Sequence, residues 1–468
     1  MRNRTRCSFK SYYILFLTII ILGLACFTLA EESSQKIDEE NVKAIIEKAQ
    51  PLIEEITGMK FKERIRFNLV KREVVRDILA EEFLPQFKNL LKGSDNDVIT
   101  RQVQTSAHAA SQSILGKYAL IKKEFLIIPD NVEFVTKIFD IKDEDFQDFV
   151  FLVVAHEMVH ALDDQYFELQ KKEIAMENAE HIQAFSALVE GHAVYVTDKI
   201  AEQLKLSETA KKVSTKSAAG VTDESNRLQQ QVLYNTYIKG SEFVEAIINK
   251  KGLTGVAEAF ASPPVSTRQI MNPEEYLTPS AVKTIDCLKL LENVSGSLPI
   301  NGMQTQSIAL GTMTLSAMLI ADGITENEAN AVANDCLSGA ALSAAKQTLK
   351  PKGMTILVLN FASRESAVKF IELSKKSDQS TEAQFNAKLN SSYSVVKEEE
   401  LKLEGFDSVR YRHVEKKVNE AVTTELTAEG LTDTLYIAVA FRNMQTEISE
   451  EKIGEILMSL SKERLKML

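Results

Sequence analysis

Two histidines and a glutamate in the segment His156-Glu157-Met158-Val159-His160 are spaced for metal chemistry. A separation of four residues places both imidazoles on one face of a helix, one turn apart, where they can bind the same zinc ion. Glu157 follows the first histidine, so its carboxylate can take a proton from a water molecule whose pKa the metal lowers and later give it to a leaving amine. The segment therefore predicts a zinc-dependent peptidase with Glu157 as the catalytic base.

A third metal ligand must come from elsewhere in the chain, because a catalytic zinc has three protein ligands and one open position. We predict Glu190, which lies among apolar residues beside Gly191, where the missing side chain would let its helix approach the metal-binding helix. His192 is the main alternative, since histidine is the commonest metal ligand. The weaker candidates in the same region are Glu177, Glu180 and His181.

Other polar residues have the chemistry to support such a centre. Asp163 and Asp164 follow the second histidine by about one helical turn, so one of them is expected to accept a hydrogen bond from a ligand imidazole. Surface charge at a helix end is the alternative interpretation of both. The donor to a transition-state oxyanion stays open between Tyr237, Arg268 and Tyr276.

The metal-binding segment requires a buried helix to hold it. A nearly continuous apolar stretch predicts a helix from about Asp143 to Tyr166. If the two histidines had no function, this helix would carry polar rings without partners in apolar surroundings, which is energetically costly. Further helices are predicted at 177–204 and 228–249.

A β hairpin is predicted just before this helix, from strands at 117–121 and 124–128. We expect the hairpin to form the edge of the substrate cleft and to pair with an extended peptide, as exposed sheet edges do. Proline at Leu126 and Ile128 should then weaken peptide turnover without changing zinc content.

The whole chain predicts an α+β fold, in which a mainly helical zincin-like metallopeptidase domain with a short β hairpin precedes a smaller α+β domain. The expected parts are a lead-in segment at 31–100, the metallopeptidase domain at 101–280 and the C-terminal domain at 300–468. In the C-terminal domain we expect a core helix at 308–320, an alanine-rich helix at 326–346, helices at 365–375 and 450–460, and strands at 355–361, 408–414 and 435–441.

The first thirty residues predict export. Arg2, Arg4, Arg6 and Lys10 precede an apolar run at 12–30, which is the arrangement of a signal sequence, and cleavage is expected after Ala30. The run is nearly long enough to span a bilayer, so an uncleaved N-terminal membrane anchor is the alternative. In both cases we expect an extracytoplasmic protein, either secreted or attached to the outer face of the membrane.

Net charge limits the classes of binding partner, and the cysteines limit the possible disulfide and metal chemistry. The chain of 468 residues has a formal net charge of −11 and no basic block after its N-terminus, which argues against nucleic acid and leaves a peptide or protein substrate as the expected partner. Cys287 and Cys336 are the cysteines beyond residue 30. They could form one disulfide or remain two buried thiols, and they lack the short spacing of a metal or redox site.

Three segments, in the same order along the chain, carry a family resemblance that extends beyond the motif at 156–160. They are HEMVHALDDQYF at 156–167, LVEGHA at 188–193 and the segment from Pro263 to Tyr276. Together they resemble the HExxHALQDQxF, LVEGxA and PPxSTxQIxxPxxY patterns of a little-characterised group of prokaryotic gluzincin-like metallopeptidases. The resemblance implies that His156, His160 and Glu190 bind zinc and that Glu157 acts on water.

The same resemblance has two departures. Asn272 stands where many of these proteins have histidine, and residues 336–343 lack an expected Gly-Trp-Gly-Gly-Asp-like stretch. Both departures bear on substrate specificity and activity, while the zinc motif itself is intact.

Two other classes of function remain open from the sequence. A structural or chaperone-like zinc protein would close its site with a fourth ligand such as His192 or His181. A surface-anchored interaction protein would bind its partner through the C-terminal domain and would not depend on Glu157.

Overall fold

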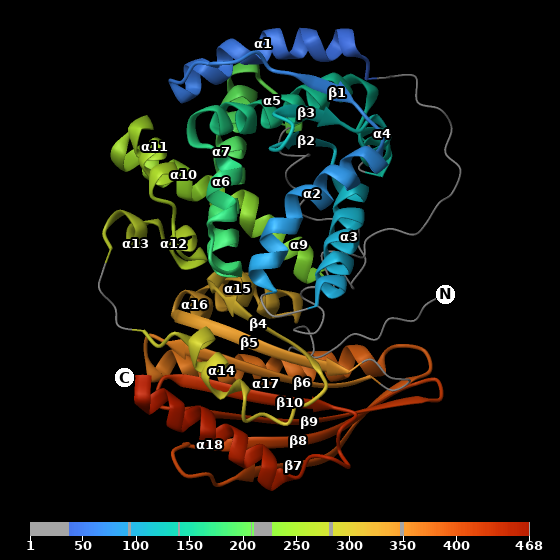
Figure 1. Ribbon diagram of the computed structural model, residues 1–468, viewed down its shortest axis with the longest axis vertical. Coiled ribbons are helices and arrows are strands. Elements are labelled where there is room, and N and C mark those ends of the chain that lie inside the picture. The colour runs from blue at the N-terminus through green and yellow to red at the C-terminus, as the bar shows by residue number, and fades with distance from the viewer. Residues whose placement is uncertain are drawn as a thin grey trace. The chain divides into compact units, whose positions relative to one another are not determined.

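The computed structural model describes residues 37–467 apart from 92–94, 139–140, 207, 210–226, 280–283 and 347–350. The predicted export signal at 1–30 lies outside this part of the chain, within which no helix is long and apolar enough to cross a membrane. The described chain divides into two compact units, with the boundary between Thr278 and Pro279. A mainly helical unit is followed by one built on a large antiparallel sheet, so the predicted α+β class is confirmed (Figure 1).

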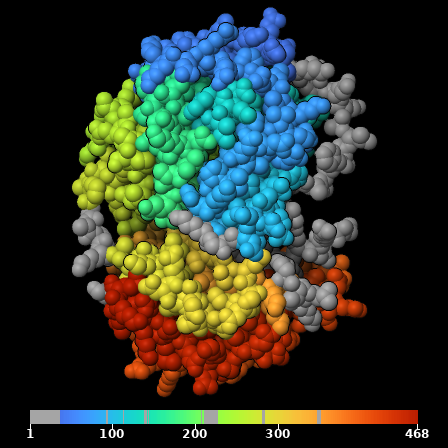
Figure 2. Space-filling view, viewed as in Figure 1, coloured from blue at the N-terminus to red at the C-terminus, as the bar shows by residue number. Residues whose placement is uncertain are grey.

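Two long helices form the centre of the first unit. α5 (Asp143–Phe167) and α7 (Ala179–Leu204) pack against each other, and their ends lie close to the predicted ones. α1 (Glu39–Thr57) is capped by the Asp38 carboxylate and ends at Gly58, whose positive φ of 69° suits glycine. Its apolar face packs on α5, so this part of the lead-in segment shares the core of the helix that carries His156 and His160. In Figure 2, α1 belongs to the dark blue part of the surface.

The remaining helices of this unit are shorter than α5 and α7. They are α2 (Arg72–Leu90), α3 (Asn96–Ser113), α4 (Pro129–Ile138), α6 (Leu169–Ile174), α9 (Arg227–Tyr234), the π-helix η4 (Asn235–Lys239), α10 (Gly240–Lys251), α11 (Leu253–Ala261), α12 (Thr267–Met271) and α13 (Pro273–Leu277). α9, η4 and α10 follow one another without a break, over the range where the sequence predicts a single helix.

A three-stranded sheet includes the predicted hairpin. β2 (Gly116–Ala119) and β3 (Glu124–Ile127) pair antiparallel, and β1 (Phe67–Leu69) pairs parallel with the other side of β3. β3 is thus the central strand, and β1 and β2 are the two edges of the sheet. Proline at Leu126 or Ile128 would remove a backbone N–H that faces β2, and so would disturb the pairing between β2 and β3. The predicted test with Leu126 and Ile128 would therefore act on the pairing inside the sheet as well as on its edge.

The second unit is built on a seven-stranded sheet in the order β4-β5-β6-β10-β9-β8-β7, with antiparallel neighbours throughout. Helices α14 (Cys287–Ser295) and α18 (Glu450–Met467) bury their apolar sides against one face. α17 (Arg364–Asn386) packs on the other face, where its Phe370 contacts Phe361 and Tyr436. The strands are β4 (Gln304–Leu310), β5 (Cys336–Lys346), β6 (Lys352–Phe361), β7 (Ser391–Leu401), β8 (Val409–Val418), β9 (Ala421–Thr432) and β10 (Leu435–Arg442).

Two helix predictions for this unit are wrong in part. Residues 308–310 end β4, and the helix α15 (Thr312–Ala321) begins only after Gly311. The alanine-rich range 326–346 is helical only in α16 (Glu326–Asn334), because the rest forms strand β5 between β4 and β6. Helix propensity of alanine is worth less than 1 kcal/mol per residue, roughly, so strand pairing in a buried sheet overrides it.

The two cysteines of this unit are buried and are not joined by a disulfide. The Sγ atoms of Cys287 and Cys336 lie 3.5 and 3.4 Å from the backbone oxygen of Ser338. Burial raises the pKa of the Cys287 thiol to about 12. At neutral pH this thiol is therefore protonated and unreactive.

Candidate metal centre

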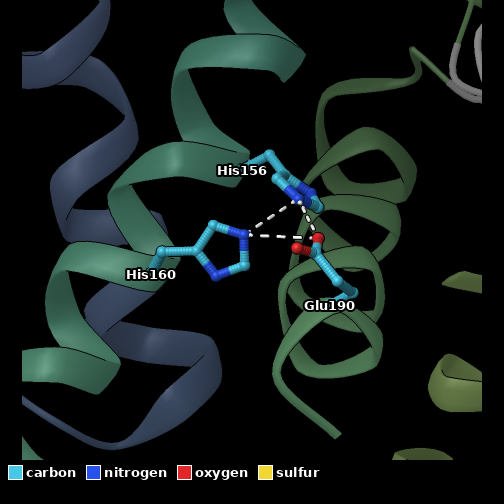
Figure 3. Close-up of side chains that lie close together, drawn as sticks. All are labelled: His156, His160 and Glu190. Carbon is cyan, nitrogen blue, oxygen red and sulfur yellow. Dashed lines mark hydrogen bonds and ion pairs between the residues drawn. The ribbon is translucent and has the colours of Figure 1, made fainter. Parts of the chain in front are cut away.

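α5 presents both histidines of the motif from a helix that is buried nearly all round. Ala155, Met158 and Val159 beside them are fully buried, so α5 has little freedom to move. α7 runs alongside and carries Glu190 toward the same point. Figure 3 shows the three side chains converging from the two helices.

The three candidate ligand atoms lie at the spacing that a tetrahedral cation requires. Nε2 of His156 is 3.2 Å from Nε2 of His160 and 3.1 Å from Oε2 of Glu190. The distance from Nε2 of His160 to Oε2 of Glu190 is 3.4 Å. Ligands bound to zinc at roughly 2.0–2.1 Å in tetrahedral geometry are about 3.3–3.4 Å apart. These residues could therefore hold a metal ion.

The electrostatics of the group favour positive charge at this point. Burial alone would lower the pKa of His160, but the carboxylate of Glu190 outweighs it and raises this pKa to about 9. Burial alone would raise the pKa of Glu190, but the two imidazoles hold it well below its usual value. Glu190 is thus anionic, and a bound cation would offset its charge.

The candidate site is partly open to solvent. The side chains of His156 and Glu190 are 17% and 26% exposed, and that of His160 is 10% exposed. Among the residues that the structure describes, no fourth His, Cys, Asp or Glu joins the group. Three protein ligands and an accessible face are typical of catalytic zinc sites, whereas structural sites have four protein ligands.

The other candidate ligands lie outside the group. Nδ1 of His192 is 2.9 and 3.0 Å from the two carboxylate oxygens of Asp163. Glu180 accepts hydrogen bonds from the backbone N–H and the hydroxyl of Thr267. Glu177 and His181 are not part of the group either. The geometry therefore favours Glu190 over each alternative.

Glu157 is held beside the metal ligands by the edge strand β2. Its side chain is buried, and Oε2 accepts the backbone N–H of Tyr118 at 2.6 Å. Gly116 permits this approach, since a Cβ there would lie 3.0 Å from Cγ of Glu157. The negative charge of Glu157 also contributes to the raised pKa values of His160 and Tyr237. The sequence gives no separate motif for Gly116 or Tyr118, although the predicted hairpin places a strand next to this helix.

The prediction that Asp163 or Asp164 accepts a hydrogen bond from His156 or His160 is wrong. Neither Asp163 nor Asp164 accepts a hydrogen bond from His156 or His160. Asp163 contacts His192, while Asp164 accepts the hydroxyl of Tyr118 and the backbone N–H of Leu169. Both carboxylates are buried, so they are not surface charges at a helix end.

Of the three candidate oxyanion donors, Tyr237 lies next to the candidate metal ligands. Its ring stacks on His156 with centroids 6.0 Å apart. The charge of Glu190, followed by burial, raises the pKa of Tyr237 well above its usual value, so the hydroxyl stays protonated. Arg268 instead pairs with Glu275, and the hydroxyl of Tyr276 donates to the backbone of Ser262.

Tyr237 lies in η4, a single π-helical turn, and such turns often occur at functional sites. The close approach of α7 and α10 brings this turn near Glu190. A Cβ on Gly191 would lie 2.1 Å from the carbonyl carbon of Gly240. The expectation for Gly191 is thus corrected: it allows close contact with α10, not with the metal-binding helix.

Comparisons with known proteins add little to this geometry. No family model matches the chain, and no curated protein matches it. Among solved structures, one from Chloroflexus aurantiacus, described as "a putative hydrolase with a novel fold", is 19% identical. The alignment covers 53% of this chain and 93% of that chain, with a TM-score of 0.38. A likeness this low carries no argument, so the case for function depends on the site.

Proposed function

We propose that this protein is an exported zinc-dependent peptidase of the gluzincin kind. The single observation that supports the proposal best is the convergence of His156, His160 and Glu190, with the buried carboxylate of Glu157 beside them. Two imidazoles and one carboxylate make a ligand set found in catalytic zinc sites. The resemblance of three ordered segments to gluzincin-like metallopeptidases points to the same class.

Zinc, when bound, would lower the pKa of a water molecule and polarise the scissile carbonyl. Glu157 would accept the proton as the water oxygen attacks the carbonyl carbon, and would deliver that proton to the amine as the carbon–nitrogen bond breaks. The backbone N–H of Tyr118 orients the carboxylate for both transfers. Tyr237 would donate its hydroxyl proton in a hydrogen bond to the developing oxyanion.

The proposal is tested by hydrolysis of a mixed peptide library, read by mass spectrometry, before and after treatment with a zinc chelator. We expect cleavage that stops on chelation and returns when zinc is added. A protein that binds zinc tightly but cleaves no peptide in the library would support the non-catalytic alternative, a structural or interaction protein.

Replacing Tyr237 with phenylalanine should lower kcat by roughly 10²-fold or more, because one donor to the oxyanion is lost. Zinc content should not change, since the hydroxyl is not a metal ligand. Tyr276→Phe is the matched control, because its hydroxyl contacts the backbone of Ser262 away from the metal ligands. Steady-state kinetics on one peptide checks both variants, and equal rates for Tyr237→Phe and the wild type would remove Tyr237 from the mechanism.

The edge of β2 supports the hypothesis that an extended peptide pairs with it. Leu115 and Ala119 direct backbone oxygens toward the β3 side, so the alternation of a strand turns the backbone of Gly116 and Tyr118 the other way. At Tyr118 the N–H already donates to Glu157 and the oxygen accepts Nζ of Lys117, so Gly116 is the position of β2 left for a peptide. A peptide N-methylated at a residue that pairs with β2 should show a KM raised by about 10-fold, since one hydrogen bond is lost. Scanning the methyl group along a good substrate checks this, and a scan without position dependence would contradict it.

Export is proposed from the basic and apolar segments of the first thirty residues. N-terminal sequencing of the protein recovered from outside the cytoplasm should begin at Glu31. A chain that retains Met1 and stays with the membrane would indicate the uncleaved anchor, and one that remains in the cytoplasm would contradict export.

A further inference from the structure

The consecutive aspartates that follow the metal motif are both buried and contact different parts of the unit. Asp163 is 0% exposed and Asp164 is 3% exposed, so each carboxylate depends on protein partners. Successive residues of a helix point about 100° apart, which turns the two side chains toward different neighbours. Asp163 lies three residues after His160, on the side of the helix that carries the metal ligands. Asp164 lies seven residues after Glu157, two turns along the same side as the catalytic base.

Asp164 fastens the β2–β3 hairpin to α5. Its carboxylate accepts the hydroxyl of Tyr118 at 3.0 Å and forms an ion pair with Lys123 in the hairpin turn. It also accepts the backbone N–H of Leu169 at 3.0 Å, which fixes the chain after the helix. One buried carboxylate thus contacts both the strand and the turn of the hairpin.

Tyr118 connects Asp164 to the catalytic base. Its hydroxyl donates to Asp164 and its backbone N–H donates to Glu157, so α5 contacts this residue at two points. The position of Tyr118 therefore decides whether its N–H can reach the Glu157 carboxylate. Loss of the hydroxyl contact would loosen β2 where it meets the base.

Asp163 fastens α7 to α5. Both of its carboxylate oxygens lie within hydrogen-bond distance of Nδ1 of His192, whose ring is buried and packs edge-on against Phe260. His192 lies two residues beyond Glu190 on α7. The contact therefore joins the helix that carries His156 and His160 to the helix that carries Glu190.

We propose that Asp163 and Asp164 are positioning residues with separate tasks. Asp163, through His192, sets the spacing of the two helices that carry the metal ligands. Asp164, through Tyr118, holds β2 so that its backbone orients Glu157. The assignment to base and ligands depends on the function proposed above, whereas the two contacts can be tested without it.

The experiment compares Tyr118→Phe and Asp163→Asn in the full-length protein, because each substitution keeps the size of the side chain. Tyr118→Phe should lower kcat by about 10-fold while KM and the zinc dissociation constant stay unchanged, since it disturbs the orientation of the base alone. Asp163→Asn should raise the zinc dissociation constant by roughly 10-fold, the lower end of what supporting residues contribute, and leave kcat at saturating zinc within about 3-fold. Asp164→Asn should behave like Tyr118→Phe and serves as its second variant.

The matched control is Tyr166→Phe, also on α5, whose hydroxyl contacts the backbone of Lys60. It should change neither kcat nor zinc affinity. A purely structural role for the aspartates predicts instead that all variants lose kcat, zinc affinity and thermal stability together, and that result would overturn the division of tasks.

Amide hydrogen exchange and zinc competition do not depend on activity. Exchange in residues 115–119 should rise in Tyr118→Phe and not in Asp163→Asn. If the wild type cleaves no peptide but these two readouts separate as expected, the peptidase proposal fails and the positioning contacts stand. If Tyr118→Phe and Asp163→Asn change hydrogen exchange and zinc affinity in the same way, the inference is wrong even in an active enzyme.

Discussion

Glu157→Gln is expected to reduce kcat by about 10²–10⁴-fold, the contribution of a general base, while the protein keeps its metal. The amide of glutamine cannot take the proton of the attacking water, but its oxygen can still accept the backbone N–H of Tyr118. The fold around the site should therefore survive. Initial rates on one peptide, at equal zinc content, measure the effect.

The control for this prediction is Glu144→Gln, the same chemical change at an exposed position of α5. Its rates should equal those of the wild type. If Glu157→Gln retains a rate within about 3-fold of the wild type, then Glu157 is not the general base, because such a small loss is outside the range for that role.

Gly191→Ala is expected to destabilise the helical unit by about 3 kcal/mol or more, at or above the upper end for overpacking. The added Cβ would lie 2.1 Å from the carbonyl carbon of Gly240 and 2.3 Å from its oxygen. These are backbone atoms, so a change of side-chain rotamer gives no relief and α7 must move away from α10. Glu190 is the neighbouring residue, so zinc affinity should fall along with the melting temperature.

Gly296→Ala is the matched control for Gly191→Ala. Gly296 follows α14 with a φ of −65°, and an added Cβ would meet no atom within 4 Å. Its stability should be unchanged or rise by up to about 1 kcal/mol, because alanine restricts the unfolded chain. Thermal unfolding and zinc content are measured for both variants. A Gly191→Ala protein that melts and binds zinc like the wild type would contradict the close packing of α7 and α10.

The sequence predicts the two helices that carry the candidate metal ligands well, because α5 and α7 are long and strongly apolar. It cannot choose between Glu190 and His192 by pattern alone, since both lie on α7 and both are common zinc ligands. Two residues along a helix correspond to a turn of about 200°, so the two side chains must point to different sides. The structure turns Glu190 toward the histidines and His192 toward Asp163.

The sequence pattern does not predict contacts between segments that are far apart along the chain. Tyr118 and Gly240 carry no motif, yet the first contacts the base and the second lets α10 approach α7. In the other unit, β5 has the composition of a helix and becomes a strand because β4 and β6 pair with it on both sides. Such pairing depends on residues far apart in the chain, which local propensity does not report.

The most direct test of the metal centre is the zinc content of purified wild-type protein beside Glu190→Ala and His192→Ala, measured by elemental analysis. The three-ligand site predicts one zinc ion per chain in the wild type, loss of zinc in Glu190→Ala, and retention in His192→Ala, whose ring contacts Asp163 and not the ligand group. A wild-type protein without zinc, or zinc that is lost with His192 and kept without Glu190, would contradict the site and the peptidase function that depends on it.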